Sequence, residues 1–125
     1  MRCIIAGSRS IDDKFYDSIK NIINTLIDNK KLKIDIIISG HATGVDKLGE
    51  KFAAEYNIPT ELYIPDWSKN GKKAGYLRNE EMANNADCLI LFWDGESKGS
   101  EHTLKIAKKK GLKIYGFRLV STSYS

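Results

Sequence analysis

Apolar, β-branched runs alternate along the chain with segments in which apolar residues recur every three or four positions. The runs predict strands and the wider spacing predicts amphipathic helices, because a helix returns to the same face about every 3.6 residues. Strands are expected at 2–7, 34–40, 58–65, 87–93 and 112–118. Helices are expected at 11–29, 44–57, 76–86 and 100–111, and a polar loop is expected at 66–75.

Several of these predicted helices carry signals at their ends. Ser10 or Asp12 can cap the first helix, since a short polar side chain accepts a hydrogen bond from a free N–H of the first turn. Gly111 follows the last helix, where glycine commonly ends a helix in a left-handed conformation. The helix at 76–86 is short and weakly amphipathic, and Leu77, Met82 and Ala83 are its expected buried residues.

The alternation of strands and helices predicts an α/β fold with a mostly parallel sheet. Because crossover connections are right-handed, few strand orders are possible, and we expect the order 3-2-1-4-5. This is a Rossmann-like, three-layer architecture, and residues 1–125 are expected to form one such domain. Ligands of these sheets bind beyond the carboxyl ends of the strands where the order reverses, which is here between the first and fourth strands.

Three loops at this edge combine glycine with small hydroxyl residues and lead into a helix. They are GSRS (7–10), SGHATG (39–44) and WDGESKGS (93–100). The free N–H groups of a helix N-terminus suit a phosphate, and glycine lets the backbone approach it closely. Ordinary turns with serine or threonine as helix caps would use the same residues, so both interpretations stay open.

Charged and aromatic residues near these loops extend the phosphate hypothesis. The chain has 16 lysines but only 4 arginines, so the position of each arginine is informative. Arg9 lies two residues past Gly7 at the predicted mouth of the site, where a guanidinium can hold a phosphate in a bidentate manner. Lys98, directly before Gly99, would add a point charge. Trp67 either stacks on a base or ribose, or folds back as a loop anchor.

Composition narrows the function classes. Hydrophobic residues make up 42% of the chain and charged residues 29%, which is typical of a globular protein. No apolar run approaches the roughly 20 residues that span a bilayer, and the N-terminus lacks a signal-peptide pattern. A cytoplasmic location without a membrane partner is therefore expected. The net charge of +4 comes from lysine and favours a solvated surface over a nucleic-acid-binding patch.

Cysteine and histidine usage argues against a metal site. Cys3 and Cys88 lie in predicted buried strands and are expected to be reduced core residues rather than a disulfide. The chain has only two histidines and no Cys-x-x-Cys pattern, so neither a metal nor another cofactor is expected.

The motifs together carry a family resemblance that covers almost the whole chain. GSR (7–9), SGHATGVDKLGEKFA (39–53), Trp67 with NGKKAGYLRNEEM (70–82), and ADCLILFWDGESKGS (86–100) resemble the YspA-type branch of the SLOG superfamily. That superfamily groups Rossmann-like domains related to the DNA-processing protein Smf/DprA and to the Lonely guy cytokinin-activating enzymes. The resemblance implies a nucleotide-derived ligand, bound by the first loop and by the loop after the fourth strand. Related domains also pair through helices, which implies a homodimer.

Ligand-binding residues follow from the resemblance, position by position. The implied residues are Gly7, Ser8, Arg9, Ser39, Gly40, Asp46, Arg78, Asn79, Gly99 and Ser100. Trp67 and Lys98 join them on the physical grounds given above. His41 stands where the family usually has a second glycine, and it is either a ligand contact or a tolerated side chain.

One departure from the family pattern bears on catalysis. The Lonely guy enzymes pair an Arg-Lys-x-x-Met helix with a Pro-Gly-Gly-x-Gly-Thr-x-x-Glu loop, and use the arginine and the glutamate to cleave an N-glycosidic bond. This chain keeps the arginine and the methionine in RNEEM (78–82) but has Thr103 at the glutamate position. A hydrolase would therefore have to recruit its catalytic groups from the remaining candidates, which are Arg78, Asp46, Glu96 and Glu101.

Three functions result, in order of preference. The first is binding, sensing or sequestration of a nucleotide or nucleotide-derived ligand such as an ADP-ribose derivative. The second is a phosphoribohydrolase or nucleosidase that cleaves an N-glycosidic bond. The third, by analogy with Smf/DprA, is binding of single-stranded nucleic acid, for which the sequence offers no platform of basic and aromatic residues.

Overall fold

The alternating pattern folds into a five-stranded sheet of order β3-β2-β1-β4-β5 in the computed structural model, which describes residues 1–29 and 32–119. Every neighbouring pair of strands is parallel. The strands are β1 (Arg2–Gly7), β2 (Ile36–Ser39), β3 (Thr60–Leu62), β4 (Cys88–Trp93) and β5 (Lys113–Arg118). The predicted α/β class and strand order are confirmed.

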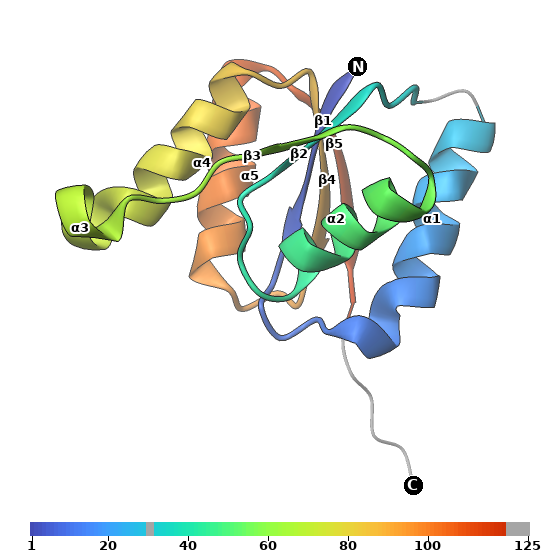
Figure 1. Cartoon of the computed structure of the whole chain (residues 1–125), viewed down its shortest axis with the longest axis horizontal. Helices are drawn as coiled ribbons and strands as arrows, with labels where there is room; N and C mark the ends of the chain where they lie inside the picture. Colours follow the sequence, from blue (N-terminus) through green and yellow to red (C-terminus); the bar gives the residue numbers. More distant parts are fainter. Residues whose placement is uncertain (30–31, 120–125) are drawn as a thin grey trace, which may run out of the picture.

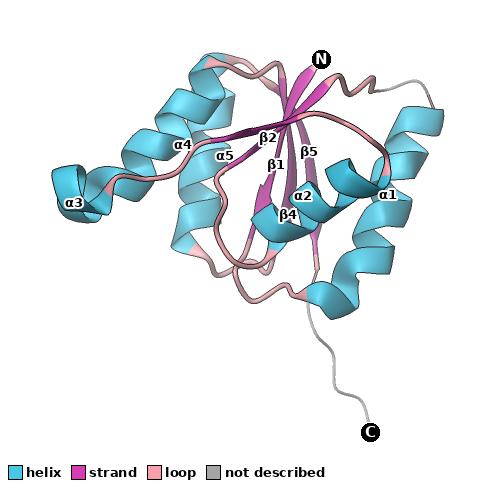
Figure 2. Cartoon of the chain, viewed as in Figure 1, coloured by secondary structure: helices cyan, strands magenta, loops and turns pink. Residues whose placement is uncertain are grey.

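Helices cover both faces of this sheet and make the three layers visible in Figures 1 and 2. On one face lie α1 (Tyr16–Asp28) and α2 (Val45–Glu55), and on the other lie α4 (Ala74–Asn84) and α5 (Lys98–Lys110). The short α3 (Trp67–Asn70) projects at one side of the domain, followed by the 3-10 turn η2 (Gly71–Lys73). A second 3-10 turn, η1 (Asp13–Phe15), precedes α1.

The central strands explain why the apolar runs are continuous. Along β1, Cys3 and Ile5 pack with the helices α1 and α2, whereas Ile4 and Ala6 pack toward α4 and α5. All four side chains are buried. A strand covered on both faces needs apolar residues at every position rather than at alternate ones.

Two segments differ from the sequence prediction. Residues 66–75, expected to be a polar loop, contain α3 and η2. The carboxylate of Asp66 accepts hydrogen bonds from the Lys69 N–H (3.1 Å) and the Ser68 hydroxyl (2.7 Å), so a polar cap supports α3 without apolar periodicity. The strand expected at 58–65 is only the three-residue β3 at the edge of the sheet.

The helix ends agree better with their signals. The Asp12 carboxylate accepts a hydrogen bond from the Lys14 N–H and caps η1, and α5 ends at Gly111 with a left-handed φ of 74°. Met82 and Ala83 are buried on α4 as expected, but Leu77 is 45% exposed, so the prediction that it is buried was wrong. It lies on the outer face of α4, which the weak periodicity of this helix did not distinguish from its inner face.

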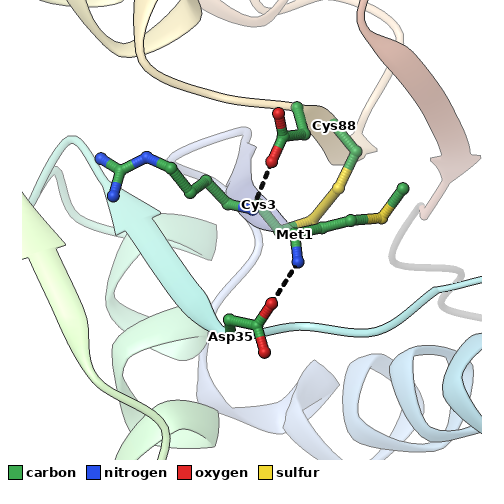
Figure 3. Close-up of a disulfide and its surroundings, with 6 residues drawn as sticks. Met1, Cys3, Asp35 and Cys88 are labelled. Atoms are coloured by element: carbon green, nitrogen blue, oxygen red, sulfur yellow. Dashed lines mark hydrogen bonds and ion pairs between the residues drawn. A yellow bond between two sulfur atoms is a disulfide. The ribbon is translucent and has the colours of Figure 1, made fainter.

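Cys3 and Cys88 form a disulfide, so the prediction of two reduced cysteines was wrong. The two residues are 85 positions apart in the sequence, but parallel pairing of β1 with β4 sets them opposite each other with a Cα–Cα distance of 4.9 Å. Figure 3 shows the bridge between the two strands. Beside it, the N-terminal ammonium of Met1 contacts the Asp35 carboxylate at 2.5 Å. The pairing could not be predicted from the sequence separation, because the pairing depends on the strand order and register.

Within the described residues, no helix has the length and apolar character needed to cross a membrane. The same residues contain no group of three or more histidine, cysteine, aspartate or glutamate side chains arranged to hold a metal ion.

Candidate functional site

A small cavity of about 80 Å³ lies at the carboxyl edge of the sheet, beyond β1 and between the helices α2, α4 and α5. Pockets for whole small-molecule ligands measure roughly 300 Å³ or more. This cavity therefore has room for a group the size of a phosphate, with the rest of a larger ligand outside it. Its lining residues are Ala6, Gly7, Arg9, Ala42, Asp46, Arg78, Asn79, Met82, Ser97, Gly99, Ser100 and Thr103.

Arg78 enters this cavity from α4 and is held at two points. Its Nη1 donates to the Gly40 carbonyl oxygen at 2.5 Å, and its Nε donates to Asn79 Oδ1 at 2.9 Å. A Cβ on Gly40 would lie 2.8 Å from Nη1 of Arg78 and 2.9 Å from Oδ2 of Asp46, so only glycine leaves room for this arrangement. No residue in the described part of the chain accepts a hydrogen bond from Nη2, which leaves that end of the fork for a ligand.

Burial perturbs the charges around the cavity. The pKa of Asp46 is raised from 3.8 to about 6, mainly by burial, although the Ala42 N–H and Arg78 oppose the rise. Burial also lowers the pKa of Arg78, and the nearby charge of Arg9 lowers it further against the attraction of Asp46. The guanidinium groups of Arg9 and Arg78 therefore lie near a single carboxyl group, that of Asp46, which is about half protonated near pH 6. The cavity carries excess positive charge and suits an anion.

The remaining two arginines are engaged elsewhere. Arg2 pairs with Glu61 at 2.7 Å near the opposite edge of the sheet. The guanidinium of Arg118 lies over Gly95, and a Cβ added to that glycine would be 3.1 Å from Nε of Arg118. The arginines that reach the cavity are therefore the two that the sequence analysis selected, Arg9 and Arg78.

The N-terminus of α5 supplies hydrogen-bond donors to the same cavity. Ser97 caps the helix, with its hydroxyl accepting a hydrogen bond from the Ser100 N–H at 3.3 Å. The N–H groups of Lys98 and Gly99 have no partner among residues 1–29 and 32–119. Ser100 is 4% exposed, and its Oγ has no hydrogen-bond partner in the described part of the protein. This hydroxyl bonds to no other protein group there, so it is available to a polar atom that enters the cavity.

Asp94 organises the two loops that border the cavity, and the sequence analysis missed it. Its Oδ1 accepts hydrogen bonds from the N–H groups of Glu96 (2.8 Å) and Ser97 (2.9 Å), and its Oδ2 from the Ser10 hydroxyl (2.7 Å). These bonds, led by that from Glu96, lower the pKa of Asp94 to about 2. The aspartate before Gly95 is typical of an Asx turn, which is the signal that could have identified it.

Ser8 takes part in this loop framework rather than in the lining. It is fully buried, and its hydroxyl accepts a hydrogen bond from the Asp94 N–H at 2.9 Å. This hydrogen bond joins the loop after β1 to the loop after β4 and so fixes the position of the backbone next to Arg9.

Two residues of the second loop turn toward α2. The Ser39 hydroxyl donates to Glu50 Oε2 at 2.7 Å, and His41 Nδ1 lies 3.0 Å from the same oxygen. Lys47 Nζ lies 2.8 Å from His41 Nε2. His41 has a φ of 60°, the left-handed region that explains why glycine is usual at this position. Neither Ser39 nor His41 lines the cavity, and Gly40 between them contributes its carbonyl to Arg78.

Trp67 and Lys98 lie outside the lining, at the surface. Trp67 is 52% exposed on α3. A Cβ on Gly75 would be 3.5 Å from the Trp67 ring and 3.8 Å from Arg78 Nη2, so the indole and the guanidinium flank the same glycine. Lys98 is exposed at the first position of α5.

The carboxylates proposed as catalytic groups separate into two sets. Asp46 lines the cavity, whereas Glu96 and Glu101 do not. Glu101 points away and pairs with Lys105 on the next turn of α5 at 3.2 Å. Thr103, at the position where the Lonely guy enzymes have glutamate, lines the cavity, and its hydroxyl donates to the Gly99 carbonyl at 3.0 Å.

A larger hollow of about 740 Å³ lies at the opposite, amino edge of the sheet. Its lining is mainly apolar and includes Leu32, Ile34, Phe52 and Ile58. The described residues around it include no arginine and no helix N-terminus with free N–H groups. Its size exceeds that of the first cavity, but its chemistry does not suit a phosphate.

The chain resembles known proteins at three levels. A family model described as the YspA, cpYpsA-related SLOG family matches residues 1–70. Over 88 residues the chain is 35% identical to the Gene 61 protein of Mycobacterium phage D29, covering 66% of this chain and 70% of that protein. The X-ray structure of DNA processing protein A (DprA) from Streptococcus pneumoniae matches with a TM-score of 0.73 and 19% identity, over 92% of this chain. The match covers 49% of that DprA chain, so this protein spans about half its length, and the likeness shows a shared fold.

Proposed function

The chain belongs to the YspA, cpYpsA-related SLOG family, and on that premise we propose that it binds a nucleotide or nucleotide-derived ligand, such as an ADP-ribose derivative. The phosphate would occupy the cavity between α2, α4 and α5. The observation that carries this proposal is the buried Ser100 hydroxyl, which lines the cavity without a partner among the described residues. Residues 1–125 act as one nucleotide-binding unit in this proposal.

Donors converge on this position from three elements. The free N–H of Gly99 and the Ser100 hydroxyl come from α5, the guanidinium of Arg78 from α4, and Arg9 from the loop after β1. Backbone N–H groups at a helix N-terminus and guanidinium forks both favour phosphate oxygens. Trp67, beside Arg78 and half exposed, is available to stack on the base or ribose outside the cavity.

The first test removes the unpartnered hydroxyl. Ser100→Ala is expected to weaken ADP-ribose binding by about tenfold, because a hydrogen bond to a charged group contributes at least about 1.5 kcal/mol and each 1.4 kcal/mol changes the affinity tenfold. The melting temperature should change little, since the Ser100 hydroxyl bonds to no other group in the described part of the protein. Isothermal calorimetry and thermal melting measure both quantities.

Ser18→Ala is the matched control for this test, since Ser18 is exposed on α1. Gly99→Ala is a second probe of the same place. Its Cβ would meet no protein atom closer than Ser97 Oγ at 3.9 Å, so it should hinder only a ligand that approaches the backbone. Unchanged ADP-ribose affinity in both cavity variants would remove α5 from the site. Mass spectrometry of any nucleotide released on denaturation would identify the natural ligand.

Binding without cleavage is the second part of the proposal. Breaking a ribose–base bond builds positive charge on the sugar, so an enzyme needs a carboxylate aimed at the ring. Thr103, which stands where the Lonely guy enzymes have glutamate, is neutral, and Glu101 is paired with Lys105 at the surface. Incubation with nucleoside monophosphates, NAD and ADP-ribose is expected to give no free base or ribose phosphate above the uncatalysed rate, as measured by chromatography.

A phosphoribohydrolase or nucleosidase is the second candidate function, and Asp46 is the observation that favours it. Its carboxyl lines the cavity, and a pKa of about 6 suits a general acid near neutral pH. Turnover that is lost in Asp46→Asn would replace the binding-only proposal with this one. Turnover lost in Glu96→Gln or Glu101→Gln would show a carboxylate recruited from outside the cavity.

Three further predictions stand beside this proposal. Binding of single-stranded nucleic acid stays a third hypothesis, supported by the DprA-like fold and not by a specific contact. A homodimer is proposed, with support from Tyr76 and Leu77, which are 50% and 45% exposed on α4. A cytoplasmic location stays a prediction as well.

A further inference from the structure

A chain of side-chain hydrogen bonds connects Arg78 to a histidine on the neighbouring helix. The Nε of Arg78 donates to Asn79 Oδ1 at 2.9 Å, and Asn79 Nδ2 lies 3.2 Å from Nδ1 of His102. Asn79 is 7% exposed, so its amide has little access to water as an alternative partner. His102 lies on α5, next to the lining residue Thr103.

The donors and acceptors along this chain fix the protonation state of the histidine. An arginine Nε–H can only donate, so the oxygen of the Asn79 amide must face Arg78 and its NH₂ group must face His102. An amide NH₂ can also only donate, so Nδ1 of His102 must be unprotonated. The arrangement in the structure therefore requires neutral His102 with its hydrogen on Nε2.

The surroundings of His102 favour that neutral state. Burial is the main cause that lowers its pKa below the ordinary value of 6.5, and the charge of Lys105 on α5 lowers it further. Glu80 on α4 opposes the shift. The Tyr76 ring, also on α4, packs against the imidazole with centroids 4.4 Å apart and an interplanar angle of 60°. At pH 7 and above the histidine is neutral and the hydrogen-bond chain is complete.

We propose that His102 is a positioning residue that holds Arg78 through Asn79 and makes anion binding at the cavity depend on pH. Protonation at Nδ1 puts two donors face to face, so the Asn79 amide must release either the histidine or Arg78. This inference rests on the proposed phosphate-binding function and adds a regulation of that site.

The direction of the pH effect distinguishes His102 from the other titrating group at the site. As pH falls, protonation of His102 breaks this chain, so Asn79 holds Arg78 less firmly and anion binding weakens. Protonation of Asp46 near pH 6 removes a negative charge from the cavity and strengthens anion binding. A phosphate monoester also titrates near pH 6. ADP-ribose avoids this complication, because its pyrophosphate is a diester without a second ionisation in that range.

Two substitutions of His102 by side chains of similar size distinguish a role in positioning Arg78 from a role in packing. His102→Asn keeps an acceptor oxygen for Asn79 and cannot be protonated, whereas His102→Leu removes the acceptor. By calorimetry with ADP-ribose at pH 7.5, His102→Leu should lose about five- to tenfold in affinity, as expected for a lost buried hydrogen bond. His102→Asn should stay within about twofold of wild type. Between pH 7.5 and 5.5 the wild type should lose affinity relative to His102→Asn, in which only the strengthening by Asp46 protonation remains.

Equal affinity of His102→Leu and wild type would overturn the inference, as would a wild-type pH profile in His102→Asn. If ADP-ribose does not bind the wild type, that result counts against the proposed function and not against the role of His102. The role of His102 can then be tested without a ligand. In ¹⁵N NMR spectra, His102 should show the Nε2–H tautomer, and the Arg78 Nε–H signal should shift as His102 titrates. A fixed Arg78 signal across that titration would also overturn the inference.

Discussion

Arg78→Ala is expected to weaken ADP-ribose binding by about 10- to 100-fold at pH 7.5. A charge-assisted hydrogen bond in a desolvated site contributes about 1.5–3 kcal/mol, and each 1.4 kcal/mol changes the affinity tenfold. Arg78 is partly desolvated in the free protein, as its lowered pKa indicates, and its Nη2 has no partner among the described residues. The ligand therefore gains a strong contact without the cost of freeing the guanidinium from another partner.

The control for Arg78→Ala is the removal of a positively charged side chain that lies far from the cavity. Lys110→Ala removes one positive charge from the last turn of α5, at the far end of the helix from the cavity, and should leave the affinity unchanged. Arg78→Lys should not restore binding, because an ammonium cannot bond Gly40, Asn79 and the ligand in one plane. If Arg78→Ala and Lys110→Ala bind alike, Arg78 is not part of the site.

Reduction of the Cys3–Cys88 disulfide is expected to lower the melting temperature by about 10 °C. A disulfide stabilises mainly by restricting the unfolded chain, and bridges over long loops contribute typically about 2–4 kcal/mol. This bridge closes a loop between residues 85 positions apart. For a domain of this size each kcal/mol corresponds to about 3–6 °C. The shift is measured by differential scanning calorimetry of the oxidised protein and of protein whose disulfide has been reduced in the unfolded state.

The double variant Cys3→Ala, Cys88→Ala supplies the control for reduction. Both side chains are fully buried, so the variant melts lower than the oxidised wild type, but its melting temperature should not respond to reductant. The purified wild type, denatured without reductant, should react with no thiol reagent. Two reactive thiols under those conditions would mean that the cysteines are reduced in solution.

The sequence predicted best what local patterns determine. The run RCIIAG at 2–7 became β1 without a change of boundary, and the glycine at 111 ended α5 in the left-handed conformation. The strand order followed from alternation and handedness, because these rules leave few alternatives. Short elements held by polar caps, such as α3, lack the periodicity on which this prediction depends.

Contacts between distant residues were beyond such patterns. The disulfide requires the register of β1 against β4, and the chain from Arg78 to His102 requires the packing of α4 on α5. The unpartnered state of Ser100 can be recognised only when all of its neighbours are known. By contrast, Arg9, Asp46, Arg78 and Gly99 were selected beforehand from motif and chemistry, and all four line one cavity.

The central place of β1 in the sheet has a consequence for how the chain folds. This strand is synthesised before both of its partners, residues 36–39 on one side and residues 88–93 on the other. Both ladders join segments far apart in the sequence, so each closes a long loop before its contacts give any stability. Until Trp93 has been synthesised, β1 keeps an unpaired edge and uncovered apolar side chains. We therefore expect the nascent chain to be most prone to aggregate during the synthesis of residues 40–93.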